Sequence, residues 1–276
     1  MRIRLAHSPD PDDAFMFYGL AQGHVDAGPY AFEHILEDIQ TLNERAMRGE
    51  YEVTALSIHA YPHVADRYIL TSCGASMGDG YGPMIVTRTA CDLESLRGKV
   101  IAVPGLMTTA YLALQLLLGK GSVEPRVTMF DRIPDEVAAG RVDAGLIIHE
   151  GQLTYARAGL HCVIDLGAWW KERTGLPLPL GGNAIRRDLG REHCARIADI
   201  VRASIRYGLA HRDEAVGYAL RYGRDLDRGL ADRFVGMYVN EWTVDYGPRG
   251  REAIARLLGE GAAAGLVPSV GTLEFV

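Results

Sequence analysis

Hydrophobic residues gather in short runs along the chain, and each run ends abruptly in polar or turn-forming residues. Two runs, Ile3–His7 and Lys99–Val103, open two halves of similar design. Two further runs, Val53–Ser57 and Ala144–His149, follow a glycine and a short link with an acidic residue. Short apolar runs between turn signals are typical of buried strands. The pattern therefore predicts an α/β protein in which strands alternate with helices.

A helix is predicted after each opening strand. Behind the first strand, two prolines prevent further strand pairing and three aspartates favour a helix N-cap, so we expect a helix over Phe15–Gln22. Behind the second strand, Thr108 or Thr109 can cap an apolar helix that is closed by Gly119. The two halves thus repeat one plan of strand, loop and helix.

The last third of the chain has a different pattern, with apolar residues at helical spacing, for example at Ile197, Val201 and Ile205. We expect these helices to return and pack on the first half. This predicts a discontinuous lobe one, residues 1–88 plus 185–276, with lobe two, residues 89–184, between its parts.

Alternating strands and helices predict parallel sheets, and ligands of such sheets bind beyond the carboxyl ends of the strands. Ser8, Ser57, Gly105 and His149 all occupy such positions. If the halves form separate lobes, these residues wall a cleft between them. The sequence therefore predicts a ligand site between two lobes.

Composition and charge exclude several classes of protein. The chain has 276 residues, 48% hydrophobic and 23% charged, which is typical of a globular protein and excludes bulk disorder. Its net charge is −6 and no stretch gathers Lys and Arg, so we expect no nucleic-acid partner. The longest apolar helix is too short to cross a bilayer, and the first residues contain no export signal, so we expect a cytoplasmic protein without membrane insertion. The four cysteines are widely spaced and read as reduced structural thiols.

His149 is the main catalytic candidate, because a buried strand delivers it to an open end and imidazole can move protons near neutral pH. The alternative is a structural histidine that only binds neighbouring backbone. His59 and His63 have the i, i+4 spacing of a helical metal site, but Pro62 lies between them and no glutamate accompanies them. We therefore expect no metal.

Hydroxyl groups are the candidate ligand-binding groups. Thr108 and Thr109 begin a helix, where free N–H groups favour a carboxylate or phosphate. Ser57 lacks a nucleophile-elbow pattern and reads as a hydrogen-bond donor. Among the aspartates near residue 12, one can cap the helix and another, such as Asp13, can hold a substrate hydroxyl. Trp169 and Trp170 supply either an apolar ligand wall or packing between the lobes.

Several motifs resemble one known family, the 1,4-dihydroxy-6-naphthoate synthases of the futalosine route to menaquinone. They extend over essentially the whole chain: Ser8-Pro9-x-Pro11-x-Asp13-x-Phe15, Leu36-Glu37-Asp38 with Thr41-Leu42-Asn43, Val103-Pro104-Gly105 with Thr108-Thr109-Ala110-Tyr111, Ala144 to Glu150, and Asp165 to Trp170 through Leu180-Gly181.

The resemblance implies a two-lobed, type II periplasmic-binding-protein-like fold that acts as an enzyme. It also implies cleavage of cyclic dehypoxanthinyl futalosine, an aromatic carboxylate, with His149 as the proposed base and no cofactor. The chain has Asp10 and Asp12 where the family commonly has Cys and Asn. A paralogue such as a chorismate dehydratase, or a non-catalytic solute-binding protein, is therefore the alternative. The sequence leaves the oligomeric state open and is compatible with a homodimer.

Overall fold

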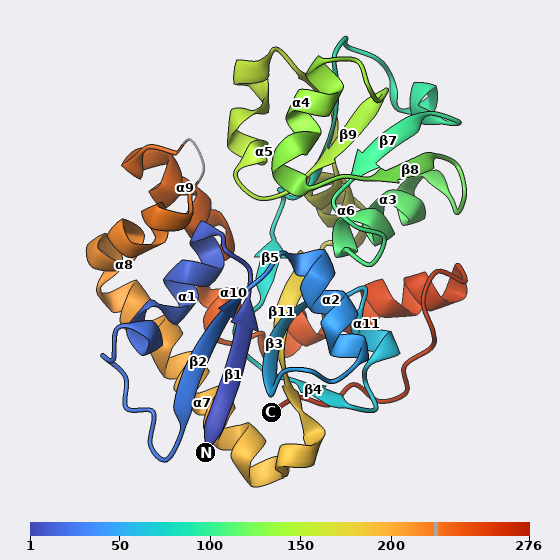
Figure 1. Cartoon of the computed structure of the whole chain (residues 1–276). Helices are drawn as coiled ribbons and strands as arrows, with labels where there is room; N and C mark the ends of the chain where they lie inside the picture. Colours follow the sequence, from blue (N-terminus) through green and yellow to red (C-terminus); the bar gives the residue numbers. More distant parts are fainter. Residues whose placement is uncertain (224–225) are drawn as a thin grey trace.

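The computed structural model describes residues 1–223 and 226–276 and shows two lobes, each built around one β-sheet (Figure 1). In the first sheet the strands lie in the order β2-β1-β3-β11-β4, and β5 pairs with β11. Its strands are β1 (Arg2–His7), β2 (Ala31–Leu36), β3 (Val53–Ser57), β4 (Tyr68–Leu70), β5 (Ser76–Gly78) and β11 (Leu178–Arg186). We call the lobe around this sheet lobe one.

The second sheet forms lobe two and has the order β10-β6-β9-β7-β8. Its strands are β6 (Met84–Thr87), β7 (Val100–Val103), β8 (Glu124–Val127), β9 (Ala144–Ile147) and β10 (His161–Asp165). The four strands predicted from the hydrophobic runs are all present. β3 has the predicted bounds, whereas β9 ends two residues before His149.

Both sheets are mixed, which corrects the expectation of parallel sheets. β1 runs parallel to β2 and β3, and β7 runs parallel to β8 and β9. The strands that follow each passage between the lobes are antiparallel: β6 to β9 and β10, and β11 to β3, β4 and β5. A strand that follows a passage between the lobes starts at the edge of its sheet that faces the other lobe. The parallel strands of that sheet end at the same edge, so the entering strand runs antiparallel to them.

Strand pairing shows that the chain crosses between the lobes several residues before the predicted limits at 88/89 and 184/185. β6 already belongs to the second sheet and the whole of β11 to the first, so the chain crosses at residues 79–83 and 175–177. The predicted limits are late because the sheet to which β6 and β11 belong is decided by long-range pairing.

Helices flank both sheets and connect the strands. They are α1 (Pro11–Ala21), α2 (Ile39–Met47), α3 (Thr109–Leu118), α4 (Ile133–Ala138), α5 (Gly151–Thr154), α6 (Leu166–Thr174), α7 (Arg191–Ala210), α8 (Arg212–Ala219), α9 (Arg228–Tyr238), α10 (Glu241–Val244) and α11 (Gly247–Ala263). In the part of the chain that the structure describes, none of them is long and apolar enough to span a bilayer.

N-terminal caps fix the positions at which α1 and α3 begin, and so fix the loops that join them to the preceding strands. The side chain of Asp10 caps α1, and Pro11 occupies its first turn, so α1 begins four residues before the predicted Phe15. Thr108 caps α3, and Gly119 follows its last residue, as predicted. Each cap lies just beyond a strand of its sheet, so both helices point their N-termini toward the space between the lobes.

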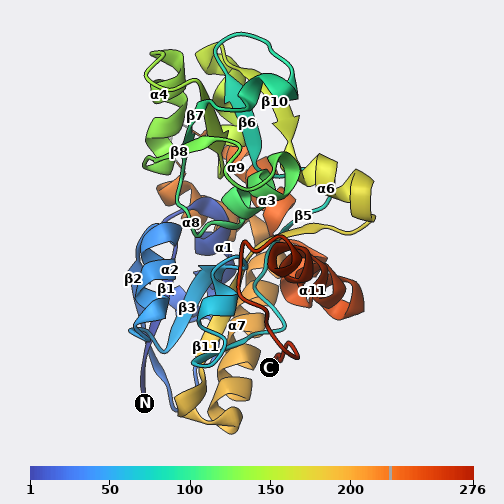
Figure 2. The same cartoon turned by 90° about the vertical axis from the view of Figure 1, so that its right-hand side faces the viewer.

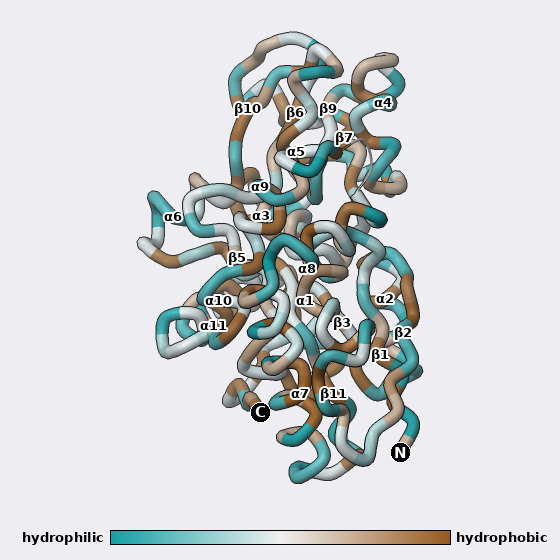
Figure 3. The backbone as a smooth tube through the Cα atoms, turned by 90° about the vertical axis from the view of Figure 1, so that its left-hand side faces the viewer, coloured by the Kyte–Doolittle hydropathy of each residue, from teal (hydrophilic) through white to brown (hydrophobic). Residues whose placement is uncertain are grey.

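The C-terminal helices return to lobe one, as predicted. α7 packs along α1, and the buried hydroxyl of Ser204 donates a hydrogen bond to the carbonyl of Met16. Figure 2 shows α7 beside the first sheet and α11 below lobe two, and Figure 3 shows hydrophobic stretches along β11 and α7. Lobe one therefore combines both ends of the chain into one scaffold for the loops that face lobe two.

Candidate functional site

A cavity opens between the lobes at the ends of β1, β3 and β9, with about 700 Å³ of empty space including its mouth. Six of the seven predicted site residues line it: Ser8, Asp13, Ser57, Thr108, Thr109 and His149. They come from both lobes, so the cavity is complete only when the lobes face each other. The prediction of a ligand site beyond the strand ends is consistent with this geometry.

Gly105 is the predicted site residue that does not line the cavity. A Cβ on Gly105 would lie 2.1 Å from Oε1 of Gln40. That oxygen accepts a hydrogen bond from the N–H of Met107 at 3.2 Å. Gly105 therefore allows α2 to approach the loop before α3, and its role in the structure is packing between the lobes.

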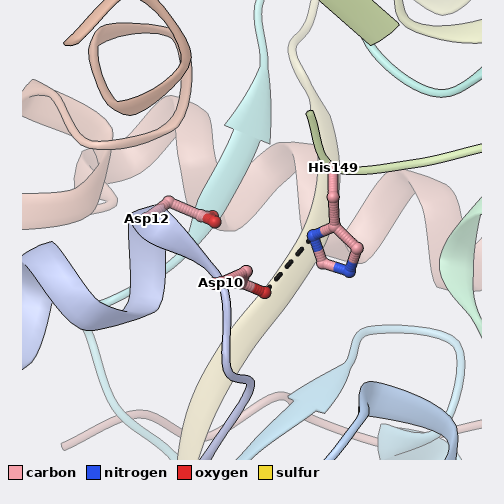
Figure 4. Close-up of side chains that lie close together, drawn as sticks. All are labelled: Asp10, Asp12 and His149. Carbon is pink, nitrogen blue, oxygen red and sulfur yellow. Dashed lines mark ion pairs between the residues drawn. The ribbon is translucent and has the colours of Figure 1, made fainter. Parts of the chain in front are cut away.

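His149 lies two residues beyond β9 and projects toward α1 of the opposite lobe (Figure 4). Its Nδ1 is 3.3 Å from Oδ2 of Asp10, and the edge of the imidazole meets Phe130 with ring centroids 4.7 Å apart. The side chain is 14% exposed, and Nε2 is buried without a hydrogen-bond partner. The ring is thus fixed at Nδ1, while Nε2 makes no hydrogen bond to the protein, in a residue that lines the cavity.

The backbone at His149 is unusual. Its φ is +54°, and it is the only non-glycine residue with positive φ in residues 1–223 and 226–276. Left-handed backbone is costly for most side chains, although Asn, Asp and His adopt it more often than others. Such strain persists only where the surroundings enforce it and is common at functional sites.

Three buried carboxyl groups surround the start of α1 and differ in electrostatics. Burial would raise the pKa of Asp10, but the positive charge available at His149 opposes this, and the pKa of Asp10 is lowered overall. Burial and the neighbouring Asp10 raise the pKa values of Asp12 and Asp13 well above the usual range. The first turn of α1 therefore holds one carboxylate beside the histidine and two carboxyl groups that resist ionisation.

Hydrogen bonds orient the two outer carboxyl groups. Asp13 Oδ2 accepts the N–H of Ser8 at 2.7 Å, and Asp12 Oδ2 accepts the hydroxyl of Ser76 at 3.0 Å. Asp13 is therefore used at least partly to shape the loop after β1. The second oxygen of Asp12 is buried and has no hydrogen-bond partner.

Ser57, the last residue of β3, is held by Asn43. The N–H of Ser57 donates to Oδ1 of Asn43 at 2.8 Å, and Nδ2 of Asn43 donates to the Ser57 hydroxyl at 3.0 Å. Asn43 is fully buried in α2. The Ser57 hydroxyl consequently has its own proton free to donate into the cavity.

The two threonines at the start of α3 already have hydrogen-bond partners. Thr108 donates to the carbonyl of Gly105 at 2.8 Å and accepts the N–H of Tyr111, as an N-cap does. Thr109 donates to the carbonyl of Leu180 and accepts the N–H of His59 at 3.1 Å. Any anion bound here would meet mainly the N–H groups of the first turn of α3.

His59 does not pair with His63 in a three-ligand cluster. Nδ1 of His59 lies 3.0 Å from the carbonyl oxygen of Thr108, while His63 is exposed in the 3₁₀ turn Tyr61–His63. The group of three potential ligands found among the described residues is Asp10, Asp12 and His149 instead. The i, i+4 spacing fails because no α-helix forms across Pro62.

The tryptophan pair serves packing. The indole of Trp170 is fully buried, and its N–H donates to the carbonyl of Pro177 at 3.1 Å, while Trp169 packs against the same core. Neither residue is among those that line the cavity. Of the two interpretations of the sequence, the one as a ligand wall is therefore wrong.

Sequence reasoning missed three polar residues of the cavity, namely Ser76 in β5 and the pair Gln152 and Tyr238. Tyr238 at the end of α9 donates to Oε1 of Gln152 in α5 at 2.7 Å, across the lobes. Burial raises the pKa of Tyr238 well above its usual value, so the phenol stays neutral. Gln152 and Tyr238 lie in ordinary helical sequence, and only the three-dimensional return of the C-terminal helices brings Tyr238 to this position.

Comparisons with known proteins agree on one family. A family model described as menaquinone biosynthesis matches residues 3–263. The chain is 46% identical to a 1,4-dihydroxy-6-naphthoate synthase of Thermus thermophilus over 96% of this chain and 95% of that protein. It is 42% identical to the protein of the same name in Streptomyces coelicolor, over 98% and 96% of the two chains.

Solved structures extend the comparison to the fold. A protein of Archaeoglobus fulgidus is 50% identical and superposes with a TM-score of 0.92, covering 96% of this chain and 98% of that one. The alkanesulfonate-binding protein of Xanthomonas axonopodis pv. citri is 12% identical, with a TM-score of 0.67 over 97% and 94% of the chains. The fold is therefore that of the periplasmic binding proteins, which confirms the predicted fold class.

Proposed function

Because this chain belongs to the menaquinone biosynthesis family and resembles its naphthoate synthases over nearly its whole length, we propose that it is a lyase that releases 1,4-dihydroxy-6-naphthoate from cyclic dehypoxanthinyl futalosine. A role in menaquinone biosynthesis follows from the family. The substrate, the carbon–carbon cleavage and a cytoplasmic location are parts of the proposal.

The observation that carries the proposal is the setting of His149. With Nδ1 beside the Asp10 carboxylate, the proton of a neutral imidazole is favoured on Nδ1, and the lone pair is left on Nε2. We infer that Nε2 removes a proton from the sugar-derived portion of the substrate and so starts carbon–carbon cleavage. A positioned base contributes roughly 10²–10⁴ in rate, or about 3–5 kcal/mol of the barrier.

We assign the aromatic carboxylate to the end of β3 and the start of α3. Ser57 and the first turn of α3 at Thr108 and Thr109 offer hydroxyl and N–H donors there. Among the described residues that line the cavity, none is Lys or Arg. The naphthoate would thus be held by neutral donors, and Ser8 and Asp13 would contact the sugar-derived portion.

The alternatives differ in what they do to the compound. A solute-binding protein would bind an aromatic carboxylate and return it unchanged, and a chorismate dehydratase-like paralogue would act on another substrate. The carboxyl groups of Asp10 and Asp12 in the cavity favour an uncharged, hydroxyl-rich portion of the ligand over a second anionic group. This favours the futalosine-derived substrate over chorismate.

The test is to incubate the purified protein with cyclic dehypoxanthinyl futalosine and to identify the products by mass. We expect 1,4-dihydroxy-6-naphthoate to form, and His149→Asn to lose about 10²–10⁴ in kcat while still binding the product. Asn also tolerates left-handed backbone, so this variant removes the imidazole without adding strain. Unchanged substrate with the wild-type protein, or more than about a tenth of wild-type kcat in His149→Asn, would contradict the proposal.

A further inference from the structure

Asp10, Asp12 and His149, the proposed base, form a cluster of possible metal ligands (Figure 4). The proposed cleavage gives the carboxyl group of Asp12 no catalytic role. We propose that these three side chains bind a divalent transition-metal ion, and that the bound ion inhibits the enzyme. The inhibition rests on the proposed function of His149, whereas the metal binding does not.

The geometry of the cluster suits a metal. One ligand atom from each residue lies within 4.8 Å of the others, and His149 Nδ1 and Asp10 Oδ2 are 3.3 Å apart. Ligands of a tetrahedral zinc ion with bonds of about 2.0–2.2 Å are separated by about 3.3–3.6 Å. The first pair already has this separation, and a carboxyl oxygen of Asp12 lies within 4.8 Å of both atoms.

A second observation is independent of the clustering. Asp12 is only 6% exposed, and its Oδ1 is buried with no hydrogen-bond partner, although buried carboxyl oxygens nearly always have one. The Asp12 side chain extends from α1 toward His149 (Figure 4). Its other oxygen accepts the hydroxyl of Ser76, which would orient the carboxyl group as outer hydrogen bonds orient metal ligands.

Charge favours the same interpretation. Asp10 is 2% exposed, and the described residues lining the cavity include three aspartates but neither Lys nor Arg. A divalent ion would neutralise the Asp10 and Asp12 carboxylates. One imidazole and two carboxylates suit zinc, cobalt, nickel or manganese better than calcium, which prefers only oxygen ligands.

Inhibition follows from the nitrogen that the metal would use. A metal on Nδ1 takes that lone pair and leaves the ring proton on Nε2. Nε2 then cannot accept a proton from the substrate. The metal-bound and catalytically competent forms of His149 are therefore mutually exclusive.

The first experiment measures metal binding without substrate. Chelator-treated protein is titrated with Co²⁺, and visible absorption bands of low-coordinate cobalt are followed, with Zn²⁺ added as competitor. We expect one site, and we expect Asp12→Asn to weaken Co²⁺ binding by about tenfold or more. Asp13→Asn is the matched control, because it removes a buried carboxyl group from the same helix turn outside the ligand set. It should change the affinity by less than about threefold.

The second experiment measures turnover with and without Zn²⁺, followed by chelator. We expect Zn²⁺ to abolish turnover and the chelator to restore it. No saturable Co²⁺ binding below about 1 mM, or equal effects of Asp12→Asn and Asp13→Asn, would overturn the metal site. Full turnover with the site occupied would overturn the inhibition. If His149→Asn loses Co²⁺ binding but keeps turnover, the proposed base is wrong and the metal site stands. Zinc should also raise the Tm of the wild type but not that of Asp12→Asn. A cooperative thermal transition in each protein shows that both are folded.

Discussion

The hydroxyl of Thr109, at the start of α3 in lobe two, donates a 2.5 Å hydrogen bond to the carbonyl oxygen of Leu180 in β11 of lobe one. The same hydroxyl accepts the N–H of His59, also from lobe one. One side chain that lines the cavity thus ties the lobes together. The contact would exist only in the closed arrangement of a protein whose lobes move apart to admit a ligand.

Thr109→Val should weaken substrate binding more than it slows turnover. Valine keeps the shape but leaves the N–H of His59 unpaired when the lobes close, and the Leu180 carbonyl keeps only its hydrogen bond from the N–H of Ile58. An unpaired buried polar group costs about 1–3 kcal/mol, so we expect KM to rise about tenfold or more with a smaller change in kcat. Steady-state kinetics checks this, with the exposed Thr89→Val as control. An unchanged KM would show that this contact does not support the closed state.

Asp10→Asn should separate two roles of one side chain. Asn caps a helix about as well as Asp, so α1 should keep its start and the protein its fold. The carboxylate beside Nδ1 is lost, however, and the amide can favour the wrong tautomer of His149. Asp10 would then be a positioning residue for the base, and we expect kcat to fall about 10²-fold or more with little change in KM.

Kinetics of three variants would check the role of Asp10. Asp10→Glu retains a carboxylate and should recover part of the lost kcat, whereas Asp10→Ala should lose both kcat and about 1 kcal/mol of stability through the missing cap. If Asp10 served only as the helix cap, Asp10→Asn should have a kcat close to that of the wild type and higher than that of Asp10→Glu.

The parts of the fold set by local sequence could be predicted. The strand Val53–Ser57 is a continuous apolar run, and α3 has both a threonine cap and a closing glycine, so propensity and packing agree at each. β11 could not be placed, because Leu178–Arg186 contains glycines and a proline and is defined by pairing with three strands distant in sequence. Its position depends on long-range contacts that leave no local pattern.

The same limit applies to the site. A strand end followed by His149 is visible in the sequence, and its place in the cavity was predicted. The aspartates were recognised as a group, but the one facing the histidine could not be chosen, because this depends on how lobe two sits on lobe one. Tyr238 and Gln152 lie on helices far apart in the chain and meet only across the lobes.

Gly167→Ala should destabilise the protein, because the added methyl group would collide with backbone in the segment that crosses between the lobes. A Cβ on Gly167 in α6 would lie 1.9 Å from the carbonyl oxygen of Tyr81, in the segment that leads from β5 to β6. Backbone must shift to relieve this contact, so we expect a loss of about 2–3 kcal/mol in the free energy of unfolding. Gly259→Ala in α11 is the matched control, because nothing lies within 4 Å of its Cβ. Alanine favours helix there and should add up to about 1 kcal/mol. Equal denaturation midpoints for the two variants would contradict the packing argument.

His7 should make the protein lose stability in mild acid. Burial, with a smaller effect of the neighbouring His34, lowers the pKa of His7 to about 4, against 6.5 for the free side chain. Its Nδ1 lies 3.1 Å from the carbonyl oxygen of Ser8, at the entrance to α1. Below pH 6.5 the unfolded chain takes up a proton at this position and the folded chain does not. The contribution to stability is therefore complete above pH 6.5 and is lost as the pH falls toward 4.

Between pH 7 and pH 5 this linkage amounts to about 2 kcal/mol in the free energy of unfolding. Asp12 and Asp13, whose pKa values burial raises, act in the opposite direction, so the informative quantity is the difference between wild type and His7→Gln at each pH. Gln can keep a hydrogen bond to the Ser8 carbonyl but does not titrate. Urea denaturation at both pH values should show the loss between pH 7 and pH 5 reduced by about 2 kcal/mol in His7→Gln. The exposed His211→Gln is the control and should behave as wild type. The same pH dependence in His7→Gln and wild type would mean that His7 is protonated in the folded protein.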